Sequence, residues 1–264
     1  MIFKSYFSKT TETYFMIHSP LANSRPTLLF IHGLGDSHVN YLQYLSSDLS
    51  KHFNVLIPDL LGYGNSSSAG DYSFQHQIQG IVDHLDFLEG TTKIKFNDII
   101  MIAHSMGGIH GTLLCESIIK YSIKGFINVE GSVTQYGSFI SENMVNALKT
   151  KIFNDWFADF KKNIHFRPYR AAVESCQPEA FHQNAAEMYE ICHASSGKFT
   201  NSIGKKFASL NMHKVYCYGD FICKETLEFL NENNVPLKYI PAKTHFVLVE
   251  CPNEVIQFIE KFCI

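Results

Sequence analysis

Apolar and polar positions follow two different periods along the first half of the chain, and their alternation predicts a mostly parallel sheet with helices on its faces. Short apolar runs suit strands buried on both faces, and they occur in TLLFIHG, NVLIPDL and DIIMIAHSMGG. Helical spacing lies between and after them, at 41–49, 74–88 and from 106 to about 120. The opening segment instead has the pattern of a hairpin, with arms at 2–7 and 14–18.

The second half divides into a helical stretch and a return to strands. Strand patterns recur in GFINVEG, KVYCYGD and LKYIPA, and PNEVIQFIEKFC has the spacing of a terminal helix. Between 132 and 211 no strand pattern occurs, and the spacing is helical with many aromatic side chains. We therefore expect a core formed by 1–131 and 212–264, with a helical insertion at 132–211. No repeat or Pro-rich linker suggests a separately folding second domain.

The strongest chemical signal is Ser105, which stands where a strand pattern changes directly into a helical one. A serine in such a turn projects its hydroxyl above the edge of the sheet, provided that small residues beside it let the strand and helix approach each other. Ala103 and Gly107 meet that requirement. The alternative is a helix N-cap serine followed by glycines, but the preceding strand favours a nucleophile.

A serine hydroxyl needs a general base within hydrogen-bond reach, because it is a poor nucleophile at neutral pH. His245 is the best candidate among thirteen histidines, since it follows the last strand pattern and should lie at the same edge of the sheet as Ser105. The alternative is a loop histidine that makes a structural hydrogen bond.

Acyl transfer also requires backbone N–H groups directed at the oxyanion, usually from the residue after the serine and from the loop after an earlier strand. These positions are Met106 and Leu34. Gly33 and Gly35 would let the second loop turn inward, although a plain tight turn would also account for them.

The motifs HGLGDS, DLLGYGNS, AHSMGG and THFVLVECPNEV, in this order and spacing, resemble the α/β-hydrolase superfamily across nearly the whole chain. The resemblance implies an eight-stranded, mostly parallel sheet flanked by helices, a helical cap between the sixth and seventh strands, and a Ser-acid-His triad in that chain order. Three residues depart from the family pattern without removing a reacting group: Ala103 replaces a glycine, Leu61 a common arginine after Asp59, and Thr244 a common glycine.

The acid of the triad has two candidates. Most members of the family carry an aspartate shortly after the seventh strand, where this chain has Ile222, and Asp220 is close but early. Some relatives, including part of the haloalkane dehalogenase group, carry it at the end of the sixth strand, where Glu130 stands. We favour Glu130, because a buried carboxylate is costly without a partner such as histidine. There are two alternatives. Glu130 could cap the next turn or bridge to the helical cap, or the triad could have a weak acid or none.

A serine nucleophile with an oxyanion site suits attack on a carbonyl, which predicts cleavage of a carboxylic ester, thioester or lipid ester through an acyl-enzyme on Ser105. Dehalogenases and epoxide hydrolases need a carboxylate at that position. Hydrolysis of a carbon–carbon bond and acyl transfer to an alcohol use the same parts and stay open.

Two other classes of protein compete with this prediction. A non-catalytic protein that binds a small ligand on the same scaffold is the first, because the usual aspartate is missing. A metallohydrolase is the second, but the sequence has no HExxH motif, and His104 and His110 lack a local carboxylate at ligand spacing. No metal and no cofactor are expected.

Composition limits the partners and the location. A net charge of -3 and a pI near 6.5 give no support for binding nucleic acid. Seven scattered cysteines without a C-x-x-C pair suit free thiols, and the chain shows neither a signal peptide nor an apolar run long enough to span a membrane. We expect a cytoplasmic protein that acts on a small ester or acyl substrate, and the oligomeric state stays open.

Aromatic residues of the insertion have two interpretations. They could roof an apolar pocket above the serine, or they could simply pack the helices onto the core, which is common for such side chains. The residues concerned are Phe153, Trp156, Phe157, Phe160, Phe166 and Tyr169.

Overall fold

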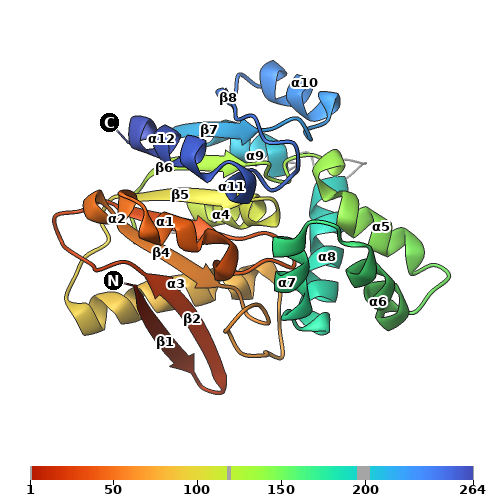
Figure 1. Ribbon diagram of the computed structural model, residues 1–264, viewed down its shortest axis with the longest axis horizontal. Coiled ribbons are helices and arrows are strands. Elements are labelled where there is room, and N and C mark those ends of the chain that lie inside the picture. The colour runs from red at the N-terminus through yellow and green to blue at the C-terminus, as the bar shows by residue number, and fades with distance from the viewer. Residues whose placement is uncertain (1, 118–119, 195–202, 264) are drawn as a thin grey trace.

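The computed structural model describes residues 2–117, 120–194 and 203–263, and one eight-stranded sheet runs through it (Figure 1). The strands are β1 (Phe3–Lys9), β2 (Glu12–His18), β3 (Thr27–Ile31), β4 (Asn54–Asp59), β5 (Ile99–His104), β6 (Ile123–Val129), β7 (His213–Tyr218) and β8 (Leu237–Tyr239). Their order is β1-β2-β4-β3-β5-β6-β7-β8. Only β2 pairs antiparallel, with β1 and β4, and every other pair in the described sheet is parallel. The predicted fold class, including the opening hairpin, is confirmed.

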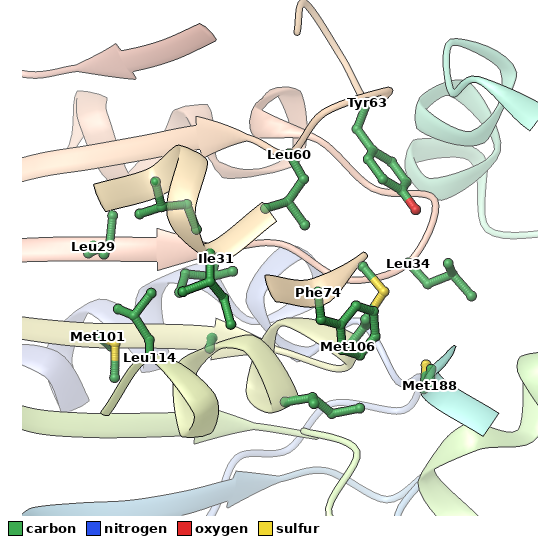
Figure 2. Close-up of a cluster of buried hydrophobic side chains, with 14 of the residues drawn as sticks. Leu29, Ile31, Leu34, Leu60, Tyr63, Phe74, Met101, Met106, Leu114 and Met188 are labelled. Atoms are coloured by element: carbon green, nitrogen blue, oxygen red, sulfur yellow. The ribbon is translucent and has the colours of Figure 1, made fainter. Parts of the chain in front are cut away.

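Helices cover both faces of the sheet, which explains why its central strands are apolar runs. One face packs on α1 (Leu42–Ser46), α2 (Leu49–His52), α11 (Val247–Glu250) and α12 (Pro252–Phe262), and the other on α3 (Phe74–Thr92), α4 (Met106–Ser117) and α9 (Ile203–Ser209). Successive strand side chains point to opposite faces, so Leu28 and Phe30 of β3 join the first layer. Leu29 and Ile31 join the second, in the cluster that also contains Phe74 and Leu114 (Figure 2).

The helices differ from the predicted ones at their ends. The helix predicted at 74–88 continues to Thr92 as α3, and Lys93 then ends it in a left-handed conformation. The helix predicted from 106 to about 120 is α4, whose last described residue is Ser117, since 118 and 119 lie outside the described residues. Helix α10 (Lys224–Glu232), between β7 and β8, was not predicted.

The helix predicted at 41–49 is broken into short pieces. A 3-10 turn, η1 (His38–Tyr41), leads into α1, and α2 begins only after Ser47. The Ser47 hydroxyl donates to the Tyr44 carbonyl and accepts from the Leu49 N–H, so the serine satisfies backbone groups that a continuous helix would pair.

A group of helices between β6 and β7 gathers at one end of the sheet (Figure 1). It contains η2 (Gln135–Ser138), α5 (Phe139–Ala147), α6 (Phe153–Asn163), α7 (Arg167–Glu174) and α8 (Pro178–His193). The next helix, α9, packs against α4, and its Phe207 meets Phe126 of β6 edge to face. The boundaries of the insertion at 132 and 211 stay a prediction. No helix in the described ranges is long and apolar enough to cross a membrane.

Of the buried histidines whose pKa is lowered, the three with the largest shifts make the stability of the fold most sensitive to acid. Burial, as the largest cause, lowers the pKa of His104 to about 3 and those of His84 and His110 to about 4, from an ordinary value of 6.5. The unfolded chain therefore binds protons below pH 6.5 that the folded chain does not bind. The stabilisation that comes from keeping these histidines neutral is thus fully present above pH 6.5 and is lost as the pH falls toward 4.

We expect the free energy of unfolding to drop by about 3 kcal/mol between pH 6.5 and pH 5.5, because each of the three sites contributes up to about 1.4 kcal/mol per pH unit. Urea titrations at several pH values measure this slope. His110→Asn should reduce the slope by about a third, whereas His52→Gln at an exposed position should leave it unchanged. An unaltered slope in His110→Asn would contradict the assignment.

Candidate active site

The loops after β3, β5 and β6 and the segment after β8 meet at one edge of the sheet, because parallel strands end on the same side. Together with the helical group they enclose a pocket. Its lining includes Leu34, Ser105 and His245, three of the residues singled out from the sequence, and also Asp36, Phe139 and Tyr169.

Ser105 occupies a sharp turn between β5 and α4. Its backbone has a φ of +53°, a left-handed conformation that costs free energy in a residue other than glycine. The N–H of Ser105 donates to the Val129 carbonyl at 3.1 Å, which ties the turn to the end of β6. A Cβ on Gly107 would lie 2.4 Å from the Ile31 carbonyl oxygen, so the close approach of α4 to β3 requires glycine there. This is the strand–turn–helix geometry that the sequence predicts.

Glu130 lies just after β6 and also has a left-handed backbone, with a φ of +47°. Its side chain is buried; Oε1 accepts the Gly219 N–H at 2.7 Å, and Oε2 lies 3.6 Å from Nδ1 of His245. That separation suits an ion pair and is longer than a hydrogen bond. The structure thus brings Glu130 and His245 together.

Strained backbone is rare elsewhere in the described chain. Five residues other than glycine have a positive φ in the described chain. The three besides Ser105 and Glu130 occupy ordinary turn positions: Thr10 in the β1–β2 hairpin, Lys93 after α3 and Asn234 after α10. The two that end neighbouring central strands are Ser105 and Glu130. Strain of this kind gathers at functional sites, where the surrounding structure enforces it.

Asp220 is paired with residues other than His245. Its carboxylate accepts hydrogen bonds from the Tyr239 hydroxyl at 2.7 Å and from Lys243 Nζ at 2.5 Å. The Lys243 bond is the main cause that lowers the pKa of this exposed carboxyl. Ile222, which stands where relatives commonly have the acid, lines a cavity of about 190 Å³ together with Glu130 and His245.

Two hydrogen-bond systems hold the loop that carries His245. The His245 carbonyl pairs with Nε2 of His104 at 2.9 Å; a carbonyl only accepts, so His104 carries its proton on Nε2. Glu250 accepts the N–H groups of Lys243 and Thr244 and the Thr244 hydroxyl. Thr244, one of the departures from the family pattern, therefore contributes a hydrogen bond that glycine could not make.

The other two departures are buried in the core. Ala103 and Leu61 both belong to the apolar cluster beneath α3 and α4. The backbone of Leu61 is paired on both sides with the Gln77 amide, whose Oε1 accepts its N–H at 2.7 Å and whose Nε2 donates to its carbonyl at 3.0 Å.

The two backbone N–H groups predicted for the oxyanion come from adjoining segments. Met106 begins α4, so its N–H has no partner within the helix, and the Leu34 N–H makes no hydrogen bond within the described chain. A Cβ on Gly33 would lie 3.0 Å from Cβ of Ser105, which shows how closely the loop after β3 approaches the serine. The side chains of Leu34 and Met106 share one buried cluster (Figure 2).

The space above Ser105 is small. It measures about 10 Å³, room for the centre of a single water molecule. Phe139 and Ile140 of α5 line it on one side and, on their other side, line a groove of about 700 Å³ between α5 and α6. The Phe139 ring also meets the His245 ring edge to face, with 5.6 Å between the centroids. No hydrogen bond joins the Ser105 hydroxyl to His245 in the described ranges; such bonds often form only with substrate.

Aromatic residues of the insertion divide between the two interpretations. Phe153, Trp156, Phe157 and Phe160 of α6 stack on one another, and the last three also pack on Phe181 of α8. Phe166 and Tyr169 instead pack on Phe246, next to His245, and Tyr169 lines the pocket.

Phe139 and Asp36 were missed from the sequence. Asp36 had a usable signal, because it is a charged residue in the glycine-rich loop directly after a buried strand. Phe139 had none, since only the packing of α5 over the sheet edge brings it to His245. Among the described residues no group of three or more histidines, cysteines or carboxylates is placed to hold a metal ion.

The chain is similar to known proteins in sequence and in fold. A family model described as alpha/beta hydrolase fold matches residues 26–167, more than half of the chain. An uncharacterised protein of Mycobacterium tuberculosis is 34% identical over 89 residues, which are 33% of this chain and 24% of that protein. The match thus spans about a quarter of that curated relative. A hydrolase from Pseudomonas aeruginosa PA01 has a TM-score of 0.76 at 18% identity, and an esterase from Exiguobacterium antarcticum 0.74 at 13%; each comparison covers 98% of both chains.

Proposed function

Because the chain belongs to the alpha/beta hydrolase fold family, we propose that it is a serine hydrolase that cleaves a carboxylic ester or thioester through an acyl-enzyme on Ser105. One observation carries the proposal. Ser105, in a strained strand-to-helix turn, shares a pocket with His245, whose Nδ1 lies beside the buried carboxylate of Glu130. This is the arrangement that turns a hydroxyl into a nucleophile.

In the proposed reaction the Ser105 oxygen attacks the carbonyl carbon while His245 takes the hydroxyl proton on Nε2. The carbonyl oxygen becomes negative and accepts hydrogen bonds from the N–H groups of Leu34 and Met106. Collapse of this intermediate breaks the bond to the leaving oxygen or sulfur, which receives the proton from His245. A water molecule then attacks the acyl-enzyme with His245 as base and releases the acid and free Ser105.

Glu130 would orient the imidazole and stabilise its protonated form, while His104 and Glu250 hold the loop. The buried carboxylate beside His245 weakens the alternative of a non-catalytic ligand-binding protein, which needs no such pair. Hydrolysis of a carbon–carbon bond and acyl transfer would use the same residues, and the choice among them lies with the substrate.

Labelling with a fluorophosphonate, which phosphonylates activated serines, tests the proposal. We expect one probe molecule per folded chain, none on heat-unfolded protein, and a modified peptide that contains Ser105. Failure of the folded chain to react would favour the ligand-binding alternative. Modification at another serine would reject Ser105 as the nucleophile.

The small space above Ser105 predicts a preference for short acyl groups, which the side chain of Phe139 enforces. Phe139→Ala should join this space to the groove between α5 and α6, and each additional buried methylene contributes about 0.8 kcal/mol. The ratio of kcat/KM for hexanoate over acetate esters should then rise by about tenfold or more. Phe221→Ala, which removes a ring beside His245 that does not line the groove, should leave the ratio unchanged. The same hexanoate-to-acetate ratio in both variants would contradict the proposal that Phe139 limits the length of the acyl group.

A further inference from the structure

The hydroxyl of Tyr169 is a buried polar group without a partner. Tyr169 belongs to α7, is 4% exposed, and lines the pocket that contains Ser105 and His245. Its hydroxyl oxygen makes no hydrogen bond within the described chain. Buried hydroxyl groups are nearly always paired, so an unpaired one on a residue that lines the same pocket as Ser105 requires an explanation.

The position of this hydroxyl is set by the loop that supplies a predicted oxyanion donor. A Cβ on Gly35 would lie 2.9 Å from the Tyr169 oxygen, so the hydroxyl sits over the residue next to Leu34. The Tyr169 ring packs on Phe246, with 4.7 Å between the centroids, and so adjoins the residue that follows His245. The two ends of the side chain therefore lie against Gly35 and Phe246, the sequence neighbours of Leu34 and His245.

Asp36 is the carboxylate whose charge acts on Tyr169, and its oxygens already accept other hydrogen bonds. It accepts the Ser37 N–H, the Asn40 amide and the Tyr41 hydroxyl at 2.6 to 2.9 Å. The same Asn40 amide reaches the Pro168 carbonyl at 3.4 Å, which connects this cluster to the start of α7. The cluster thus holds the start of α7 through this hydrogen bond, and the Tyr169 hydroxyl takes no part in it.

The phenol is held in its protonated form. Burial, and then the negative charge of Asp36, raises the pKa of Tyr169 well above its usual value. The group therefore keeps its proton at neutral pH, and no acceptor for this proton lies within the described chain.

We propose that Tyr169 is a catalytic residue that donates a hydrogen bond to the carbonyl oxygen of the bound ester as this oxygen becomes negative. The oxyanion would then be held by the backbone N–H groups of Leu34 and Met106 and by one side-chain donor from the helical group. The hydroxyl donates a hydrogen bond in this step and keeps its proton. This inference rests on the proposed acyl transfer at Ser105.

Tyr169→Phe removes only the hydroxyl and gives opposite expectations for activity and stability. Loss of one oxyanion donor lowers kcat by about 100-fold, with KM within about twofold, because the bond strengthens in the transition state. The melting temperature should hold or rise, because an unpaired buried hydroxyl has been removed. Steady-state kinetics on a p-nitrophenyl ester and thermal unfolding measure the two effects.

Tyr63→Phe is the matched control. The Tyr63 hydroxyl is also buried, but it donates to Asn184 Oδ1 at 2.9 Å and does not line the pocket. Its removal should lower the melting temperature by a few degrees and leave kcat within twofold of wild type.

Three results would overturn the inference. Unchanged kcat in a well-folded Tyr169→Phe would assign Tyr169 to packing alone. A raised KM with unchanged kcat would make its hydroxyl a ground-state contact rather than an oxyanion donor. A lower melting temperature together with lost activity would show a structural role. Failure of the proposed function is distinguishable, because wild type itself would then neither react with fluorophosphonate nor hydrolyse esters.

Discussion

Ser105→Ala should lower kcat for an activated ester by about 10⁵- to 10⁶-fold, the loss that accompanies removal of a triad serine. The reaction then has no nucleophile, and the oxyanion donors alone retain a small acceleration over water. Alanine occupies the same left-handed backbone at a similar cost, so the fold should be kept. Kinetics on a p-nitrophenyl ester, with thermal unfolding as the check on folding, measures the effect.

The double variant Ser105→Ala/His245→Ala is the sharper form of this experiment. Residues that act as one unit lose their effect together, so the double variant should be no slower than the single one. Ser46→Ala, at an exposed position of α1, is the control and should match wild type. A Ser105→Ala variant that keeps more than about 1% of wild-type kcat, beyond the level of contaminating enzyme, would refute nucleophilic catalysis at this serine.

The sheet was predictable because its central strands are buried on both faces. Such strands appear in the sequence as continuous apolar runs, and β3, β4 and β5 all lie where those runs stand. Helix α10 was missed because its N-terminal cap is Cys223, whose Sγ accepts the Thr226 N–H, and cysteine is not among the usual capping residues.

The serine turn could be predicted from local sequence, but the partner of His245 could not be settled in that way. Asp220 and Glu130 both follow strands at the same edge of the sheet. Their different surroundings depend on tertiary neighbours. Lys243, 23 positions further along the chain, donates a hydrogen bond to Asp220, whereas the Gly219 N–H donates one to Glu130. The parallel pairing of β6 with β7 brings Gly219 to Glu130. The sequence of either strand alone does not show which strand it pairs with.

Residues of the helical group were still harder to place. Tyr169 belongs to a set of aromatic residues with the same helical spacing as the α6 rings, yet only Tyr169 and Phe166 face Phe246 beside the predicted base. The difference arises from the orientation of α7, to which the Asn40–Pro168 hydrogen bond contributes. Composition therefore does not decide between a roof over the pocket and plain packing, nor which ring enters the pocket.

Glu130→Gln is expected to lower kcat by about 10³- to 10⁴-fold, the loss seen when the triad carboxylate is replaced by its amide. Glutamine keeps an oxygen that can accept the Gly219 N–H, so the strained turn after β6 should persist. The change removes the negative charge 3.6 Å from Nδ1 of His245 and puts an amide in its place. The protonated imidazole then loses its stabilising partner, and the ring is held less firmly in the tautomer that accepts the serine proton.

Asp220→Asn is the matched control, since it removes one carboxylate charge from the same edge of the sheet. It breaks only the exposed pairing with Lys243 and Tyr239, so kcat should stay within about twofold of wild type. A large loss in Asp220→Asn with near-normal Glu130→Gln would move the acid to the loop after β7 and would require that loop to rearrange on substrate binding. Equal, small losses in both variants would mean that His245 acts without a charged partner. Only a selective loss in Glu130→Gln fits an acid carried at the end of β6.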